Sequence, residues 1–118
     1  MRYFSEKEFK NCTPTCTMSD MDPDFLATLD NIREDAGIPL IINCAYRSVE
    51  WDKSKGRSGK SAHCKGKAVD IMCNSSENRH KIVVAALQNG VNRIGIGKNY
   101  IHIDTDESLP QGVMWHYY

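Results

Sequence analysis

The stretch Ser61-Ala62-His63-Cys64-Lys65-Gly66-Lys67-Ala68-Val69-Asp70 decides how we expect the rest of the chain to be arranged. His63 and Asp70 carry side chains that bind hard or borderline metals, and they stand seven residues apart across Gly66. A residue without a Cβ suits a sharp turn between a histidine on a loop and an aspartate on a strand. Alternation along the strand predicts one face formed by Ala68, Asp70 and Met72, and a second formed by Val69, Ile71 and Cys73.

A third candidate ligand, His102, lies in the run Tyr100-Ile101-His102-Ile103-Asp104. Its alternation predicts a strand that buries the two isoleucines and directs His102 and Asp104 to the other face. Zinc accepts imidazole nitrogen and carboxylate oxygen, and a catalytic site keeps three protein ligands so that water or substrate takes the fourth position. His63, Asp70 and His102 are therefore a predicted three-ligand metal site. The alternative is a small structural domain in which they are ordinary polar residues.

These residues carry a resemblance to a known family. The pattern Ser61-x-His63-x-x-Gly66-x-Ala68-x-Asp70, followed by His102-x-Asp104, is similar to that of the zinc D-alanyl-D-alanine carboxypeptidases and L-alanyl-D-glutamate endopeptidases. That family shares its fold with the hedgehog signalling domain. The likeness takes in Tyr46-Arg47-Ser48 and Arg93-Ile94-Gly95-Ile96-Gly97, and so covers most of residues 38–118. The resemblance implies that His63, Asp70 and His102 bind Zn²⁺ and that the substrate is a peptidoglycan peptide.

The sequence departs from the family pattern at the catalytic base. Many members place a Glu or Asp three residues before the last ligand, or a His two before it, and here those positions are Asn99 and Tyr100. Asp104 shares the strand face of His102 and is our candidate for the general base. The alternative is that Asp104 orients His102 through a hydrogen bond, a common arrangement around metal ligands.

Two further residues are expected to act on the substrate. Arg47 follows a predicted strand, and its planar fork of donors can hold a carbonyl oxygen or a substrate carboxylate, a role that the resemblance supports more than the spacing does. Ser61 would bond to the substrate or shape the turn before His63. Trp115 and Tyr117 alternate on the last predicted strand, which is more typical of a core than of a cleft.

The composition is that of one soluble globular domain spanning residues 1–118. With 118 residues, 41% hydrophobic and 25% charged, the chain can bury one modest core. Fifteen basic and fifteen acidic side chains cancel, so the charge balance indicates neither a nucleic-acid partner nor an anionic membrane. No run approaches the ~20 apolar residues of a membrane span. A monomer is expected.

The first residues, Met1-Arg2-Tyr3-Phe4-Ser5-Glu6-Lys7-Glu8, lack the apolar run of a signal peptide. We expect synthesis in the cytoplasm, with action on the cell wall after release, as for an endolysin-like phage enzyme, a toxin or a recycling enzyme. The odd count of five cysteines argues against a complete disulfide framework, although a Cys12–Cys16 bridge stays open. Cys44 and Cys73 are expected in the core, and Cys64 is a weak competing ligand.

The remaining elements predict an α+β domain, with helices packed on one side of a mostly antiparallel sheet and the metal on its open face. A helix should run from Asp22-Pro23 to Gly37, and a second should be capped by Asn74. Its inner face is expected to contain Ile82, Val83, Ala86 and Leu87. Strands are expected at 40–44, 68–73, 91–97, 100–104 and 113–117, the last three paired with their sequence neighbours in antiparallel fashion, and a mobile basic loop at 48–62. The predicted function is a zinc-dependent metallopeptidase, with a catalytically inactive zinc-bearing binding module as the alternative.

Overall fold

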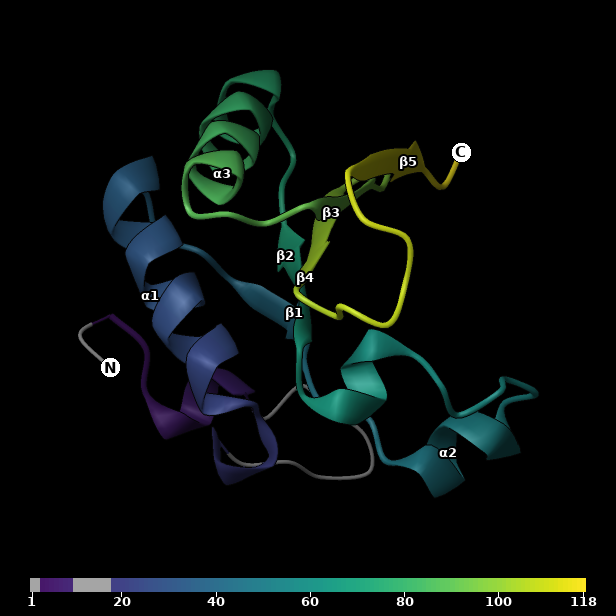
Figure 1. Ribbon diagram of the computed structural model, residues 1–118. Helices are drawn as coiled ribbons and strands as arrows, with labels where there is room; N and C mark the ends of the chain where they lie inside the picture. Colours follow the sequence, from purple (N-terminus) through teal and green to yellow (C-terminus); the bar gives the residue numbers. More distant parts are fainter. Residues whose placement is uncertain (1–2, 10–17) are drawn as a thin grey trace.

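The computed structural model describes residues 3–9 and 18–118 (Figure 1). The helices are α1 (Pro23–Ala36), α2 (Val49–Ser54) and α3 (Ser76–Gln88), with 3-10 turns at Glu6–Phe9, Met18–Asp20 and Ala62–Lys65. The strands are β1 (Ile42–Cys44), β2 (Ala68–Met72), β3 (Arg93–Ile96), β4 (Tyr100–Asp104) and β5 (Val113–His116). The question of a Cys12–Cys16 bridge lies outside the described residues.

The five strands form one sheet in the order β1-β2-β4-β3-β5. All neighbours are antiparallel except β3 and β5, which are parallel. The mixed α+β class and the mostly antiparallel sheet are thus confirmed. The expected pairing of the last strand with β4 is wrong, because β2 and β3 already occupy both edges of β4. Instead the chain crosses to the free edge of β3, where Val113 N donates to Asn92 O at 3.0 Å.

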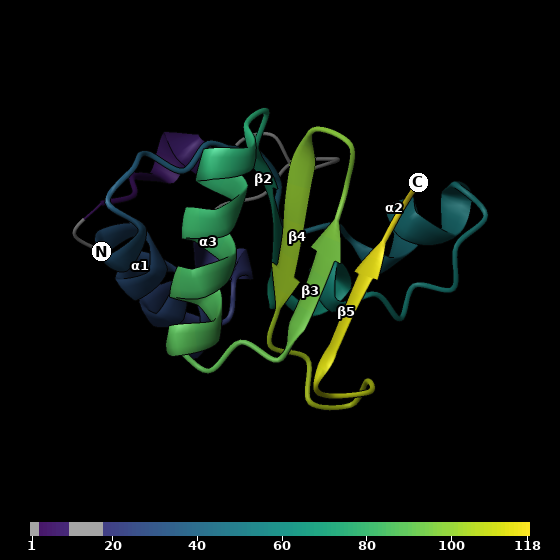
Figure 2. The ribbon, with the colours of Figure 1, turned by 90° about the horizontal axis from the view of Figure 1, so that it is seen from above.

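The core lies between the sheet and the two longer helices. Figure 2 shows α1 and α3 side by side next to the sheet, with α2 apart from both. Helix α1 begins where Asp22 Oδ2 accepts a hydrogen bond from Phe25 N at 2.9 Å and ends at Gly37, with φ of 69°. The apolar residues on one face of α1 are buried, as are those on the core faces of β2 and β4: Phe25, Leu29, Ile32, Ala36, Val69, Ile71, Ile101 and Ile103.

Helix α3 differs from the prediction in two details. Its N-cap is Ser75 rather than Asn74, because the Ser75 side chain accepts from Asn78 N at 3.1 Å. Its buried residues are Ile82, Ala85 and Ala86, whereas Leu87 is 54% exposed. Positions three and four residues after Ile82 share its face, and the fifth turns away.

The segment 48–62, expected as a mobile loop, contains α2 and begins the next 3-10 turn. Ser48 caps α2 by accepting from Trp51 N at 3.1 Å. Asp52 is fully buried and accepts from Gly59 N at 3.1 Å, which ties the end of the segment to the helix. A buried carboxylate with basic partners therefore organises a stretch that has too few apolar residues to order itself. Within the described residues, no helix is long and apolar enough to cross a membrane.

Candidate active site

One row of directly opposed residues crosses all five strands and carries the candidate site. From β1 to β5 the row contains Cys44, Asp70, His102, Gly95 and Trp115. Opposed residues of neighbouring strands share a face of the sheet, with Cβ atoms about 4.5–5.5 Å apart. Asp70 and His102 are brought together by the β2–β4 register, because each lies in the middle of its strand.

His63 reaches this row from the 3-10 turn Ala62–Lys65. Ser61 Oγ accepts from His63 N at 3.2 Å at the start of the turn, and Gly66, with φ of 70°, ends it. A Cβ on Gly66 would lie 2.4 Å from Asp20 O, and Asp22 N donates to Gly66 O at 2.8 Å. The glycine turn expected from the sequence is therefore fixed against the start of α1.

Each histidine has one ring nitrogen held by an acceptor and the other directed at Asp70. His63 Nδ1 donates to Ala45 O at 2.7 Å, which leaves Nε2 at 3.4 Å from Asp70 Oδ1. His102 Nε2 donates to Asp104 Oδ2 at 2.6 Å, which leaves Nδ1 at 3.0 Å from Asp70 Oδ1. The two ring centroids are 5.1 Å apart. Two imidazole nitrogens thus approach the same carboxylate oxygen. Among the described residues, the group whose ligand atoms lie close enough together to hold an ion is Cys44, His63 and Asp70, without His102.

The charges of this cluster are coupled. Burial by itself lowers the pKa of His63, but the hydrogen bond to Asp70 and the contact with Cys44 outweigh it, so the pKa is raised. The pKa of His102 is raised in the same way, because Asp104 and Asp70 outweigh its burial. Burial alone would raise the pKa of Asp70, yet hydrogen bonds from His102 and His63 hold that pKa well below its usual range. The cluster therefore keeps Asp70 as a carboxylate between two imidazole rings, an arrangement that suits a cation.

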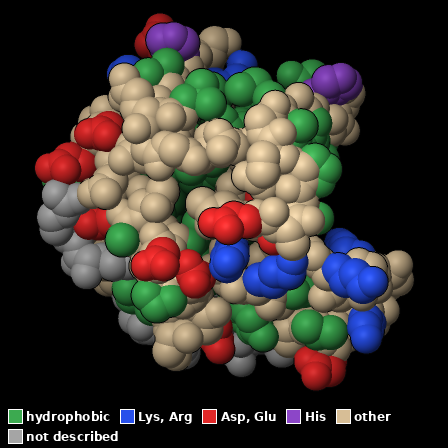
Figure 3. All heavy atoms as spheres, in the orientation of Figure 1, with side chains coloured by type: hydrophobic (Ala, Val, Ile, Leu, Met, Phe, Trp, Pro, Cys, Tyr) green, Lys and Arg blue, Asp and Glu red, His purple; other side chains and the backbone are tan. Residues whose placement is uncertain are grey.

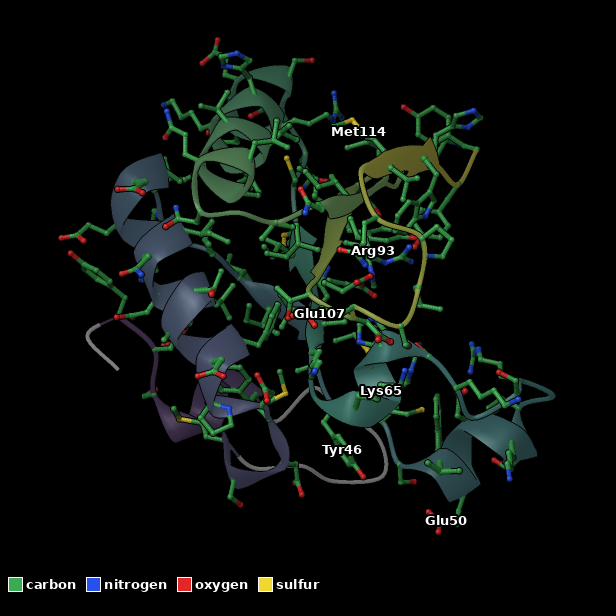
Figure 4. All side chains as sticks on the ribbon, viewed as in Figure 1. Tyr46, Glu50, Lys65, Arg93, Glu107 and Met114 are labelled. Atoms are coloured by element: carbon green, nitrogen blue, oxygen red, sulfur yellow. The ribbon has the colours of Figure 1, made fainter. Side chains whose placement is uncertain are left out.

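Asp104 is 1% exposed and has both oxygens engaged. Oδ2 contacts His102, while Oδ1 accepts from Arg93 Nε at 2.8 Å and from Asp106 N at 3.2 Å. Figure 4 shows Arg93 between β3 and the β4–β5 connection, where its Nη1 donates to Pro110 O at 2.7 Å. Of the two roles considered for Asp104, this geometry favours orienting His102 over taking a proton from water.

A cavity of about 300 Å³ opens over the cluster. Five of its lining residues were predicted from the sequence: Arg47, Ser61, His63, Asp70 and His102. The other three are Arg57, Tyr100 and Tyr117. Arg47 Nη2 donates to Ser61 Oγ at 3.1 Å, and Arg47 Nε lies 3.6 Å from Asp52 Oδ1. Ser61 therefore shapes the turn before His63 and also holds Arg47 at the cavity.

Cys44 is a site residue that sequence reasoning placed in the core. It is half-buried, and its Sγ lies 3.9 Å from His63 Nδ1. The ligand-type atoms of Cys44, His63 and Asp70 all lie within 4.8 Å of one another. Only the β1–β2 register places Cys44 opposite Asp70, and no local pattern reveals that register. His80 and His116, left out of the predicted site, are exposed.

The aromatic side of the cavity depends on two glycines, Gly95 in β3 and Gly97 just after it. A Cβ on Gly95 would lie 2.7 Å from both Trp115 Nε1 and the Tyr117 ring, and one on Gly97 would lie 2.3 Å from the Tyr100 ring. The absent side chains let these rings lie on the sheet, with the Trp115 ring 5.6 Å from that of His102. Tyr117 is 51% exposed and lines the cavity, so a core position for it was wrong. Alternate glycines in a strand were the signal available in the sequence.

Comparison with known proteins adds an independent finding. Curated protein sequences give no match to the chain. The family model for Peptidase M15 matches residues 2–104, which include His63, Asp70, His102 and Asp104 but not β5. Since the match spans well over half of the sequence, the chain belongs to the Peptidase M15 family, the zinc peptidase family that its motifs resemble.

Proposed function

We propose that the protein is a zinc-dependent peptidase that hydrolyses peptidoglycan stem peptides, as a D-Ala-D-Ala carboxypeptidase or an L-Ala-D-amino-acid endopeptidase. The observation that carries this proposal is the convergence of His63 Nε2 and His102 Nδ1 on Asp70 Oδ1, at 3.4 and 3.0 Å, beneath a polar cavity. Membership of the Peptidase M15 family supports a metallopeptidase that acts on a peptide.

His63, Asp70 and His102 are proposed to hold a catalytic zinc ion, with Cys44 beside His63 and Asp70. Two imidazoles and one carboxylate form a donor set that zinc prefers while leaving a position open. In both histidines the second nitrogen donates to an oxygen, Ala45 O or Asp104 Oδ2, which is the orienting contact usual for zinc-binding histidine. When bound, zinc polarises the scissile carbonyl and lowers the pKa of a water ligand to about 7.

Arg47 and Ser61 are proposed to position the substrate. Arg47 is held by Ser61 Oγ and lies beside Asp52, so part of its donor fork stays directed at the cavity for a carbonyl oxygen or a carboxylate. Ser61 Oγ accepts from Arg47 and from His63 N, and its own O–H remains available to a substrate acceptor. Oxyanion stabilisation of this kind commonly contributes 10²–10³ in rate.

Asp104 is proposed to act through His102. Its contact with Nε2 fixes the His102 ring in the orientation that directs Nδ1 at Asp70. Burial raises the pKa of Tyr100 and of Tyr117, so at neutral pH these cavity residues are hydrogen-bond donors and not bases. Among the described residues that line the cavity, Asp70 is then the one carboxylate. That lack of a free base favours the second candidate function, a catalytically inactive zinc-bearing module that binds peptidoglycan or protein.

Two measurements test these proposals. Metal analysis of protein purified without chelators should give one zinc per chain, and a metal-free protein that resists loading would refute both functions. Mass analysis of fragments released from defined muropeptides then identifies the bond cleaved. Fully loaded protein that releases no fragment would exclude the peptidase and leave the binding module.

A further inference from the structure

The candidate cavity has a basic residue that the proposed hydrolysis does not require. Arg57 lines it together with Arg47, although it comes from the turn after α2, outside the resembling motifs. Figure 3 shows Lys and Arg side chains gathered over α2 and this turn. Arg57 is one of the exposed residues of this segment, with 48% of its side-chain surface exposed, and it also lines the cavity. It is therefore accessible to a ligand there.

The Arg57 side chain is held in place without using its donors. Its Cζ lies 5.6 Å from the centroid of the Trp51 ring, and its backbone N donates to Asp52 O at 3.1 Å. Its Nη1 is 3.7 Å from Asp52 Oδ1, an ion-pair distance too long for a hydrogen bond. A guanidinium that is positioned by stacking and by charge, with its fork of N–H groups uncommitted, is prepared to bind a carboxylate.

The charges around the cavity also favour an anion. Asp52 is the carboxylate that faces both guanidiniums, with Oδ1 at 3.6 Å from Arg47 Nε and 3.7 Å from Arg57 Nη1. One carboxylate cannot neutralise two guanidiniums, so this wall keeps a positive charge. The proposed divalent ion likewise exceeds the single charge of Asp70. Clefts with one dominant sign of charge concentrate ligands of the opposite sign.

We propose that Arg57 is a specificity-determining residue that binds a free carboxylate of the substrate, separate from the group held by Arg47. The substrate class is then a peptide with an acidic branch beside the scissile bond, such as a stem peptide whose D-glutamyl α-carboxyl group is free and not amidated. The identity of this peptide rests on the proposed function; the carboxylate contact rests on the geometry of Arg57.

Binding, measured apart from turnover, tests the inference. The probe is N-acetyl-L-Ala-γ-D-Glu-L-Lys-amide, with the L-Ala–D-Glu bond N-methylated to prevent cleavage and the α-carboxyl group of the glutamyl residue either free or a carboxamide. Calorimetry with zinc-loaded protein should give at least about tenfold tighter binding of the free acid, because charge-assisted hydrogen bonds are about twice as strong as neutral ones. Arg57→Gln should remove this preference, because it weakens binding of the free acid much more than binding of the carboxamide.

Lys60→Gln is the matched control, because it removes one positive charge from the same segment at an exposed residue that does not line the cavity. It should keep the preference for the free acid, and both variants should match the wild type in circular dichroism and zinc content. Equal affinity of the wild type for the two probes, no binding of either, a preference that survives Arg57→Gln, or equal losses in the two variants would each overturn the inference. Preserved preference without any turnover of stem peptides would instead refute only the proposed hydrolysis.

Discussion

Replacing Gly66 by alanine should destabilise the protein far more than the same change at Gly112. Both glycines have φ of 70°, a left-handed conformation that costs an L-residue about 1–2 kcal/mol. At Gly112 nothing lies within 4 Å of the new Cβ, whereas at Gly66 it would meet Asp20 O at 2.4 Å and Met21 Cα at 2.9 Å. These backbone atoms must move, which adds about 1–3 kcal/mol for overpacking. Weakening the 2.8 Å hydrogen bond from Asp22 N to Gly66 O adds about 1 kcal/mol.

The expected loss is therefore roughly 3–6 kcal/mol for Gly66→Ala and about 1–2 kcal/mol for Gly112→Ala. Urea unfolding followed by tryptophan fluorescence measures both losses, with chelator-treated protein so that a weakened metal site adds nothing to the difference. Gly66→Ala should also lower zinc affinity, because the displaced turn carries His63. Equal losses of stability in the two variants would show that the approach of residues 20–22 to Gly66 is not a close contact.

Four other predictions concern the site. Alanine in place of His63, Asp70 or His102 should abolish stoichiometric zinc in metal analysis. His80→Ala, the control, should not. Arg47→Lys should lower muropeptide turnover on the order of 10- to 1000-fold at unchanged zinc content, because an ammonium lacks the planar fork; wild-type turnover would remove Arg47 from the mechanism. Asp104→Asn should lower zinc affinity about 10- to 100-fold, with turnover restored by excess zinc; loss that persists at full occupancy would make Asp104 the base. The raised pKa values of His63 and His102 stabilise the metal-free protein fully below about pH 6.5, and this stability is lost as pH rises through those values. Zinc binding strengthens over the same pH range, so the free energy of unfolding in urea should fall with pH for the metal-free protein and rise with pH for the zinc-loaded protein. Parallel pH dependences would contradict this coupling.

The parts of the fold that the sequence predicts correctly depend on local patterns. Helix α1 has its cap at Asp22, proline at the first position and glycine past the end, so its bounds follow from neighbouring residues. Val69 and Ile71 flank Asp70 in β2, and Ile101 and Ile103 flank His102 in β4, so this spacing predicts that Asp70 and His102 leave the core face. Gly66 is also a local signal, because a residue without a Cβ suits the sharp turn after His63.

The parts that were wrong depend on contacts between distant segments. The position of β5 is decided by which strand edges remain free, and that is known only after β2 and β3 have paired with β4. The order within residues 48–62 depends on burying Asp52, although aspartate ordinarily predicts exposure. Cys44 reaches the site because β1 pairs with β2 through an irregular register between Ile42 and Cys44. None of these features has a local pattern.

The two histidines are oriented by acceptors of different kinds, and this decides how the site can be altered. His63 Nδ1 donates to a main-chain carbonyl, Ala45 O, which no side-chain substitution removes. His102 Nε2 donates to Asp104, whose carboxylate is itself fixed by Arg93, and the Arg93 guanidinium lies 4.9 Å from the centroid of the Trp115 ring. Changes in the third and fifth strands can therefore reach His102 through a chain of side chains, while His63 stays fixed by the backbone. Substitution can thus alter the proposed metal site through His102, while the position of His63 is held by the main chain.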